Sequence, residues 1–458
     1  MTAVTPASKG QRLRRPTRAE ARFALAVLLV INMLNYADRY ILPAILPHVQ
    51  HDLQISDFEA GLLNSAFLLV YGLTTLPLGI WADRTLRKNI VSLCVGLWSL
   101  ATAITGLTRN FVQLFITRSV LGIGEAGYAP ASLSLLGDYF PRAQRGRVLS
   151  YWAAATLIGS ALGFVIGGLI ADTLGWRWAF YVVGLPGLVA AFLAWRLYEP
   201  ARGSFEEDEA QEEGQAAAST LMAEGHASLS GDFWRQARAI LRIPTYWVLL
   251  GALICSFFTI GGTSAWLPTY LFLDFHLTLS QAGLLAGALL VGSGLIGTVL
   301  GGLLADRAQR RFAQGRLLVA TLGFLIGAPL ALLALLFHQL ALFVVTLFVA
   351  GVALNFCTGP LNAVIQDVVL PEVRATALGL ALLLAHLLGD ASAPAVIGLL
   401  KEQSSLHLAL LSTAPSALLL AGLVCLVGLR TVAGDMRRMQ RSLEERRQPT
   451  TASEHVAR

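Results

Sequence analysis

The sequence is poor in charge and in cysteine. Only 14% of its 458 residues are charged, 55% are hydrophobic, and the mean hydropathy is +0.63. A soluble domain of this size needs far less apolar surface, so a soluble globular fold is excluded. The four cysteines all lie inside apolar runs, where a thiol acts as a small hydrophobic group, so neither a disulfide framework nor a metal site is expected. The composition is that of a protein that crosses a membrane many times.

Apolar runs bounded by charged or turn residues predict an all-α integral membrane protein with twelve transmembrane helices. About 20 apolar residues suffice to cross the hydrocarbon core of a bilayer. The first run is too long for a signal-peptide core and has no small-residue cleavage site, so we expect it to remain as the first helix. The expected spans are 23–47, 58–81, 89–107, 111–136, 147–171, 177–197, 246–272, 280–304, 316–337, 340–366, 375–399 and 406–429.

The lysine and arginine residues predict the orientation of these spans. With a cytoplasmic N-terminus, the outer loops hold only Arg109, Arg177 and Lys401, and two arginines lie in the membrane; the remaining 29 of 34 fall inside. This bias is the positive-inside rule, and it explains the pI near 9.3 without a nucleic-acid partner. The Ala-, Leu- and Gly-rich chain with short loops is typical of bacteria. We therefore expect a multi-pass protein of a bacterial inner membrane with both termini in the cytoplasm.

The chain divides into two six-helix bundles joined by one long loop. The expected parts are a basic N-terminus (1–22), a first bundle (23–198), a cytoplasmic linker (199–244), a second bundle (245–430) and a cytoplasmic tail (431–458). The linker begins with an acidic run, as a solvated segment does. Its last part, residues 233–242, mixes apolar and basic residues at helical spacing, as in an interfacial helix that anchors the surface or takes part in gating.

The two halves of the chain repeat each other. Ala-Gly-Leu-Leu at residues 60–63 recurs at 282–285, and Gly-Ile-Trp-Ala-Asp-Arg at 79–84 recurs as Gly-Leu-Leu-Ala-Asp-Arg at 302–307. Further on, Pro130 and Pro141 match Pro360 and Pro371 at one constant offset. Six plus six spans with a central linker is the plan of transporters with two parallel halves, whose binding site lies between them near mid-membrane.

Two spans of the first half carry charges inside the membrane. Span 1 holds Asn35, Asp38 and Arg39, and each such charge costs roughly 2.5–3.5 kcal/mol on insertion scales, so it needs a partner. Span 4 holds Arg118 and Glu125, which lie about 10 Å apart along the helix axis and cannot pair closely with each other. We therefore expect them to pair with span 1. A purely structural cluster is the alternative, although buried ion pairs are often no better for stability than apolar packing.

His386 and Asp390 in span 11 form a second candidate site. They are four residues apart, which places them on one face of an α-helix one turn apart. A neighbouring carboxylate favours the protonated imidazole, so this pair is a possible proton carrier. The alternative is a histidine that its neighbour satisfies only for packing.

The loops after spans 2 and 8 resemble the signature of the major facilitator superfamily. The small residue Gly79 allows backbones to approach closely, and Asp83 is expected to cap or pair across a cytoplasmic seam that breaks when the protein opens inward. Leu86 and Gln309 replace the glycine that usually precedes the basic pair. The expected gate residues are Gly79, Asp83, Arg84, Arg87, Gly302, Asp306, Arg307 and Arg310.

Three stretches together resemble the Spinster family of major facilitator lipid transporters. They are Asn-Tyr-Ala-Asp-Arg at 35–39, Arg-x-x-x-Gly-x-Gly-Glu-Ala at 118–126 and His-x-x-Gly-Asp-x-x-x-Pro at 386–394. The resemblance implies proton-linked movement of sphingosine-1-phosphate, lysophospholipids or related amphiphiles. By matching position it implies proton-coupling roles for Asp38 and Glu125. It also implies substrate-binding or gating roles for Asn35, Arg39, Arg118, His386 and Asp390.

The predicted function is therefore secondary transport by alternating access, without covalent chemistry, cofactor or metal. The expected partners are a lipid-like or amphipathic anion, protons and the bilayer, and the chain is expected to be a monomer. A small organic anion or a drug-like amphiphile is the alternative substrate. A non-transporting receptor would need an appended signalling domain, and a membrane enzyme would need a nucleophile or a metal cluster, neither of which the sequence offers.

Overall fold

The computed structural model describes residues 15–203 and 231–447, and within these ranges the chain is helical without strands. Apolar segments in a bilayer satisfy their backbone groups internally, which a helix does residue by residue. Six long helices make up the first half: α1 (Arg18–Leu53), α2 (Asp57–Arg84), α3 (Arg87–Thr105), α4 (Phe111–Tyr139), α5 (Arg142–Thr173) and α6 (Trp176–Trp195).

The second half repeats this plan, but two of its spans are interrupted. The span after α12 breaks between α13 and α14, and the next is divided by a five-residue π-helical turn, η2. The elements are α9 (Gly231–Ile240), α10 (Pro244–Asp274), α11 (Leu279–Arg311), α12 (Gly315–Leu336), α13 (Leu340–Asn355), α14 (Thr358–Val368), η1 (Pro371–Val373), α15 (Arg374–Ala385), η2 (His386–Asp390), α16 (Ala393–Gln403) and α17 (Leu406–Arg447).

The spans expected from hydropathy lie inside these helices, which extend further at several ends. Helix α1 begins at Arg18, where the Thr17 side chain and Glu20 form a capping box. Ser56 with Glu59 and Thr278 with Gln281 cap α2 and α11 in the same way. Helix α17 continues to Arg447, well past its apolar part. Hydropathy marks the part of a helix in lipid, whereas capping groups decide where the helix ends.

Ten helical stretches in the described residues are long and apolar enough to cross a membrane. Helices α2 and α4, of 28 and 29 residues, are long enough as well, so the fold fits twelve crossings. Their outer faces are apolar: on α3, Leu93, Leu97, Leu100 and Ile104 are all exposed. An exposed apolar stripe of this kind faces lipid.

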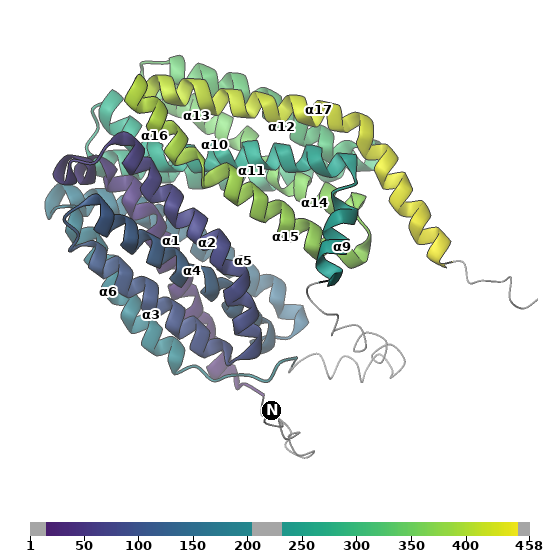
Figure 1. Cartoon of the computed structure of the whole chain (residues 1–458), viewed down its shortest axis with the longest axis horizontal. Helices are drawn as coiled ribbons and strands as arrows, with labels where there is room; N and C mark the ends of the chain where they lie inside the picture. The colour runs from purple at the N-terminus through teal and green to yellow at the C-terminus, as the bar shows by residue number, and fades with distance from the viewer. Residues whose placement is uncertain (1–14, 204–230, 448–458) are drawn as a thin grey trace, which may run out of the picture.

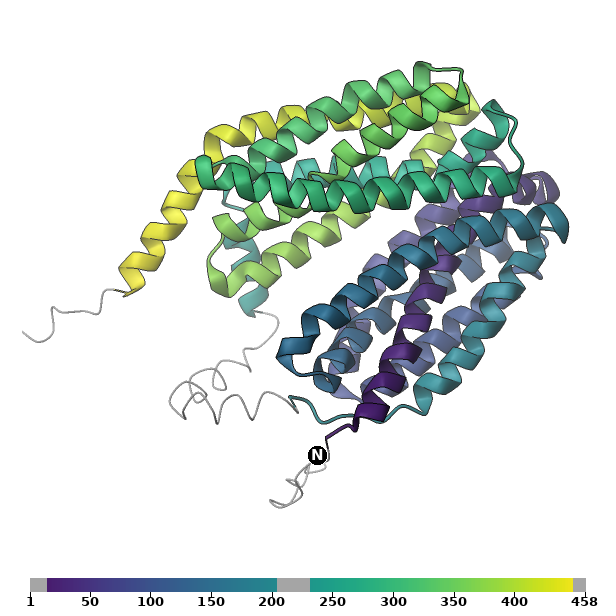
Figure 2. The ribbon, with the colours of Figure 1, turned by 180° about the vertical axis from the view of Figure 1, so that it is seen from behind.

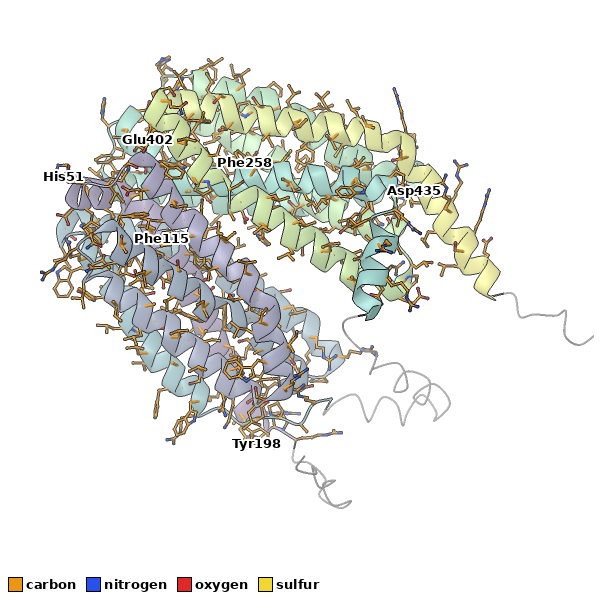
Figure 3. All side chains as sticks on the ribbon, viewed as in Figure 1. His51, Phe115, Tyr198, Phe258, Glu402 and Asp435 are labelled. Carbon is orange, nitrogen blue, oxygen red and sulfur yellow. The ribbon has the colours of Figure 1, made fainter. Side chains whose placement is uncertain are left out.

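The two halves meet at one end and diverge toward the other (Figures 1 and 2). Figure 3 shows His51 and Glu402 at the end where the halves meet, and Tyr198 and Asp435 at the opposite ends of the two separated bundles. We call the first the closed end and the second the open end. The described N-terminus, the residues on either side of the linker and the end of α17 all lie at the open end.

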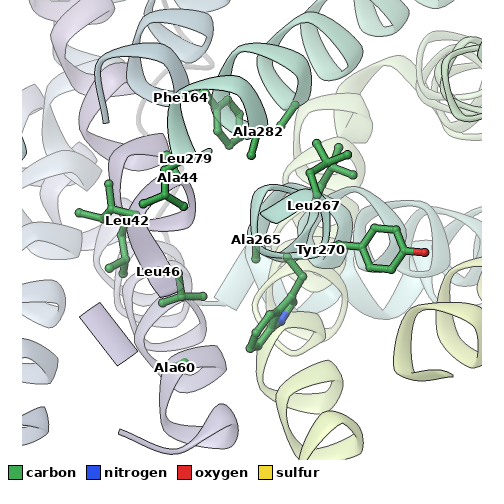
Figure 4. Close-up of a cluster of buried hydrophobic side chains, with 14 of the residues drawn as sticks. Leu42, Ala44, Leu46, Ala60, Phe164, Ala265, Leu267, Tyr270, Leu279 and Ala282 are labelled. Carbon is green, nitrogen blue, oxygen red and sulfur yellow. The ribbon is translucent and has the colours of Figure 1, made fainter. Parts of the chain in front are cut away.

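A buried apolar cluster joins the halves at the closed end. It includes Leu42, Leu46 and Phe164 from the first half together with Leu267 and Leu279 from the second (Figure 4). Each half also has a core of its own toward the open end. Helix α9 belongs to the second of these, because Ala237 and Ile240 are buried and Gln236 accepts a hydrogen bond from Thr376 at 3.0 Å. The part of the linker that we expected to be solvated, residues 204–230, lies outside the described residues.

Candidate functional site

Helix α1 brings its charges into the interior of the first half, and helix α4 supplies their partners. The Nε of Arg39 lies 2.5 Å from Oε2 of Glu125, whose side chain is fully buried. The Nη1 of Arg118 lies 3.8 Å from Oδ1 of Asp38, and both side chains are at most 3% exposed. The expected pairing between spans 1 and 4 is confirmed. Because Asp38 and Arg39 point about 100° apart on the helix, each one meets a different residue of α4.

Arg39 is the most accessible of the four charges. Its side chain is 16% exposed, and its guanidinium carbon lies 5.0 Å from the centre of the Tyr36 ring, 5.3 Å from Phe67 and 4.5 Å from Tyr71. Aromatic faces attract a cation, most strongly where water is excluded. This charge is therefore held by Glu125 on one side and by rings on the other, and it retains a route to a ligand.

Asp38 and Arg118 form the more deeply buried pair. The Thr102 hydroxyl of α3 donates a short hydrogen bond to Oδ2 of Asp38. The Arg118 guanidinium lies 5.0 Å from the centre of the Phe180 ring, and its Nε and Nη2 have no hydrogen-bond partner among residues 15–203 and 231–447. The long ion pair and these unpaired donors describe a charge that packing holds more than hydrogen bonding does.

Glycines bring α4 against its neighbours at this level. A Cβ added at Gly122 would lie 2.7 Å from the carbonyl oxygen of Phe67 in α2, and one at Gly124 would lie 2.7 Å from the backbone nitrogen of Trp98 in α3. The close approach expected for span 4 is therefore present. It places Glu125 and Arg118 within reach of α1.

A hydrogen-bond network beside the charges was not predicted from the sequence. The Tyr128 hydroxyl donates to Oδ1 of Asn32 at 2.6 Å, and Nδ2 of Asn32 donates to the Thr156 hydroxyl at 2.8 Å and to the Trp152 carbonyl at 2.9 Å. These bonds tie α1 to α4 and α5. Asn32, three residues before Asn35, was the available signal, because a buried amide in a membrane helix needs partners.

His386 and Asp390 do pair, but not across an α-helical turn. Their segment is a π-helix, and Nδ1 of His386 lies 2.8 Å from Oδ2 of Asp390. The ring of Phe257 packs edge-on at 4.8 Å from the imidazole. A Cβ added at Gly261 would lie 2.5 Å from Cβ of Asp390, so that glycine makes room for the acid. The expectation of an α-helical turn is wrong here, and π-turns of this kind are frequent at functional sites.

The largest cavity runs from this charged cluster into the second half. Its volume is about 250 Å³, and its walls are mostly apolar side chains of α10 to α13 and α17, such as Leu290, Leu347 and Leu354. Tyr36 and Tyr40 of α1 form its wall toward the first half. At the positions that match Arg118 and Glu125, the second half has Phe348 and Asn355. The cavity is thus polar at one side and apolar at the other.

The signature loops lie at the open end, where the halves are apart. A Cβ at Gly79 or Gly302 would meet nothing within 4 Å, so the close approach expected at these glycines is absent in this conformation. Arg87 is buried within the first half, paired with Asp138 and, at 2.9 Å, with Glu199. Asp306 is 67% exposed, 3.6 Å from Arg316, whereas the side chain of Asp83 is outside the described part. Arg84, Arg307 and Arg310 are exposed.

Nothing in the described residues offers three His, Cys, Asp or Glu side chains that could hold a metal ion together. Two buried ion pairs, an apolar cavity and two diverging bundles define a polytopic transporter. The family model described as Major Facilitator Superfamily matches residues 28–394, with a second match over 274–449. The chain belongs to the major facilitator superfamily, and family and fold indicate a transporter rather than an enzyme.

Among curated proteins, the chain is similar to those named Spinster, which confirms the predicted resemblance. It is 27% identical to "Protein spinster" of Drosophila melanogaster over 84% of this chain and 63% of that protein. It is 28% identical to "Protein spinster homolog 1" of Homo sapiens over 86% and 75%, and 29% identical to "Protein spinster homolog 3" of Danio rerio over 83% and 77%. The chain thus spans somewhat less than two thirds of the Drosophila relative.

Solved structures agree on the fold. A bacterial homologue of the human lysosomal transporter Spinster, in an inward-facing and unoccupied conformation, superposes with a TM-score of 0.74 at 22% identity, over 93% of this chain and 99% of that one. The same homologue class in an occupied conformation gives 0.70 at 24% identity, over 95% and 100%. The nucleoside transporter NupG gives 0.64 at 15% identity, over 88% and 98%.

Proposed function

We propose that this protein is a proton-coupled secondary transporter that moves an amphipathic anion by alternating access. The observation that carries the proposal is the continuity between the ion pairs of the first half and the apolar cavity of the second. Tyr36 lines that cavity, and its ring also contacts the Arg39 guanidinium. A substrate with an anionic head and an apolar tail matches both ends at once.

Arg39 is the proposed head-group ligand. Its guanidinium is partly exposed, whereas the guanidinium of Arg118 is nearly fully buried beside Asp38. An arginine binds a phosphate or carboxylate bidentately, and its carboxylate partner can exchange for the substrate. The tail then lies among Leu290, Leu347 and Leu354. Sphingosine-1-phosphate and lysophospholipids have this build, and the similarity to proteins named Spinster supports the same substrate class.

Asp38 and Glu125 are the proposed proton carriers. Two acids and two bases give a neutral site when all four are ionised, and protonating one acid makes the site net positive. Proton binding therefore favours anion binding, and by linkage the anion favours the proton. Asn35 is fully buried one turn from Asp38 on the same helix, and we assign it to the same site. His386 and Asp390, at the edge of the second half, are the alternative titrating pair.

The open end is the proposed cytoplasmic side. With this orientation 29 of 34 Lys and Arg face the cytoplasm or its boundary. The protein is then an inward-open inner-membrane transporter of two bundles, 23–198 and 245–430, and it binds its substrate as a monomer. In the outward-open state the signature loops meet, and Asp83 and Asp306 stabilise that seam by pairing or capping at neighbouring helix ends.

Transport into sealed vesicles tests coupling. The purified chain is reconstituted, and uptake of a radiolabelled lysophospholipid or of sphingosine-1-phosphate is measured with and without an imposed pH gradient. Asp38→Asn and Glu125→Gln should abolish gradient-driven uptake yet retain exchange at equal pH, because the amide has the shape of the protonated acid. Asp52→Asn, which removes an exposed acid, is the matched control. Wild-type gradient-driven uptake in both acid variants would sink their assignment and favour His386 with Asp390.

The same vesicles test the substrate class. A short dicarboxylate that has an anionic head but no tail should neither be taken up nor compete. Replacing Leu347 by Asn, which places a polar group in the cavity wall, should weaken competition by longer-chain amphiphiles more than by shorter ones. Uptake of the dicarboxylate with no uptake of either lipid would favour a small organic anion instead.

A further inference from the structure

Two seams hold the closed end together, and both are built on glycine. In the first seam α2 packs against α16, and in the second α5 packs against α11. A Cβ added at Gly61 or Gly398 in the first, or at Gly168 or Gly283 in the second, would come within 3.0 Å of backbone atoms of the opposite half. Backbone therefore meets backbone at four places, and no side chain separates the halves there.

The two seams are copies of each other. Gly61 and Gly283 are 222 residues apart, as are the α2 and α11 residues that the partner glycines contact, Asp57 and Leu279. Gly168 and Gly398 are 230 residues apart, as are Phe164 and Pro394 on the facing helices. Each contact across one seam thus has its counterpart, by the internal repeat, across the other.

A carboxylate crosses each seam to the first turn of a helix in the opposite half. Oε1 of Glu402, in the last turn of α16, accepts the backbone N–H of Phe58 at 2.9 Å. Oδ2 of Asp172, in the last turn of α5, accepts the backbone N–H of Ser280 at 2.8 Å and the Ser280 hydroxyl at 2.5 Å. Phe58 and Ser280 are both the second residue of their helix, and the two acids are again 230 residues apart.

We propose that Asp172 and Glu402 are a pair of carboxylate clamps that stabilise the closed end, each by capping a helix of the other half. The first turn of a helix has N–H groups without intrahelical partners and a partial positive charge, so an anion is favourable there. These caps differ from the capping boxes of Ser56 and Thr278, which stay within one half. A clamp bond exists only while the halves touch, so its free energy favours this one conformation.

The first clamp carries an additional charge pair. Nζ of Lys401 lies 2.6 Å from Oδ1 of Asp57, across the same seam, and 5.0 Å from the ring centre of Trp266. The positions that match Lys401 and Asp57 in the other seam are Ala171 and Leu279, so the second clamp has no such pair there. It has the Ser280 hydroxyl instead. The clamps are thus symmetric in their caps and different in their supporting contacts.

The clamps rest on the alternating-access part of the proposed function, since a state that is open at this end must break both. The test needs neither substrate nor a pH gradient, so its failure is distinct from a failure of transport. Nitroxide labels on Leu107→Cys and Leu408→Cys report the closed end, and labels on Leu86→Cys and Phe312→Cys report the open end. All four positions are exposed. The four native cysteines are replaced by alanine, and the full chain is measured in nanodiscs.

Asp172→Asn and Glu402→Gln should each raise the population that is open at the closed end by about two- to fivefold, which is the size of a charge at a helix end. The double variant should multiply the two effects, because the seams share no residue. Asp52→Asn is the matched control: it removes an acid at the same end that pairs with Arg177, at 2.5 Å, within one half. It should leave the populations unchanged.

Folded single and double variants with the distance distributions of Asp52→Asn would overturn the clamps. Two milder variants keep the test decisive if an amide variant fails to fold. Ser280→Ala removes one of the two donors to Asp172 and should shift the population in the same direction by less. Asp172→Glu retains the charge and should stay near the wild type; a shift as large as that of a neutral variant would show that shape rather than charge holds the seam.

Discussion

Arg118 shows what a buried charge costs when its partner is removed. Its side chain and that of Asp38 are 3% and 1% exposed. In Arg118→Ala the Asp38 carboxylate keeps only the Thr102 hydroxyl and the more distant Arg39, so we expect a loss of about 3–5 kcal/mol of unfolding free energy. Denaturant unfolding in detergent micelles measures it. Adding Asp38→Asn to Arg118→Ala should recover part of the loss, because no unpaired charge then remains.

Arg177→Ala is the matched control for this prediction. Its ion pair with Asp52 is also at the end of a helix of the first half, but the two side chains are 38% and 45% exposed. Exposed pairs contribute about 0–1 kcal/mol. If Arg118→Ala were as mild as Arg177→Ala, the Asp38–Arg118 pair would not be a buried ion pair.

The charged cluster could be predicted from the sequence only in part. Because a charge inside the membrane needs a partner, the pairing of span 1 with span 4 followed from Asp38, Arg39, Arg118 and Glu125 alone. The hydrogen bond from Thr102 did not, since a threonine in a membrane helix usually donates to its own backbone, as Thr105 does here to Ala101. The clamps were also missed. An acid at a helix end is ordinary, and only the repeat, which aligns Asp172 with Glu402, distinguishes these two.

At the scale of the elements, two glycines of α5 separate packing from helix propensity. A Cβ at Gly163 would lie 3.0 Å from the carbonyl carbon of Ala37 in α1, next to Asp38, whereas one at Gly146 would meet nothing within 4 Å. Gly146→Ala should therefore stabilise the protein by up to about 1 kcal/mol, as alanine does in a helix. Gly163→Ala should destabilise it, because α1 and α5 must separate.

Unfolding of both alanine variants under the same conditions checks this. Equal stabilisation by the two substitutions would mean that α5 does not pack against α1 through Gly163. The seam of small residues in span 5 was predicted as a packing feature, and Gly159, Gly163 and Gly167 all face α1. The structure adds that Gly168, one residue on, faces the other half instead.

The interruptions of the second half had weaker signals in the sequence. Hydropathy averages over a whole span, so neither the break before Thr358 nor the π-turn at His386–Asp390 alters it. Pro394 was an indication, because proline is tolerated in the first turn of a helix and it lies in the first turn of α16. A new helix start four residues after Asp390 is what that position implies.

For the whole molecule, the distribution of basic residues predicts the sidedness of the membrane. Cysteines introduced at Gly214 and at Ala452 should both resist a membrane-impermeant maleimide added to intact cells, because both lie on the cytoplasmic side; these two positions are outside the described residues. Leu107→Cys, exposed at the closed end, is the control and should react from outside. Reaction at either of the first two positions would overturn the twelve-span count.

The architecture of two repeated halves could be read from the chain, but its conformational state could not. Recurrence of residues 60–63 at 282–285 fixes the symmetry of the halves, and that symmetry is common to every state of the transport cycle. Which end is closed depends on contacts between the halves worth little individually, such as the bond from Phe58 to Glu402. Differences of that size lie below what a hydropathy pattern can indicate.

The π-turn at His386–Asp390 has a consequence for how one membrane span opens. On one side of it α16 is held to α2 through Gly398, and on the other α15 lies at the open end beside α9, with Thr376 bonded to Gln236. Amide hydrogen exchange should therefore follow two separate time courses, slow in α16 and faster in α15, as for two cooperative units. A single shared time course would show that the span moves as one rod. With two, the turn is a joint within the span, and a change that stiffens it slows the cycle while leaving the clamps and the charged cluster as they are.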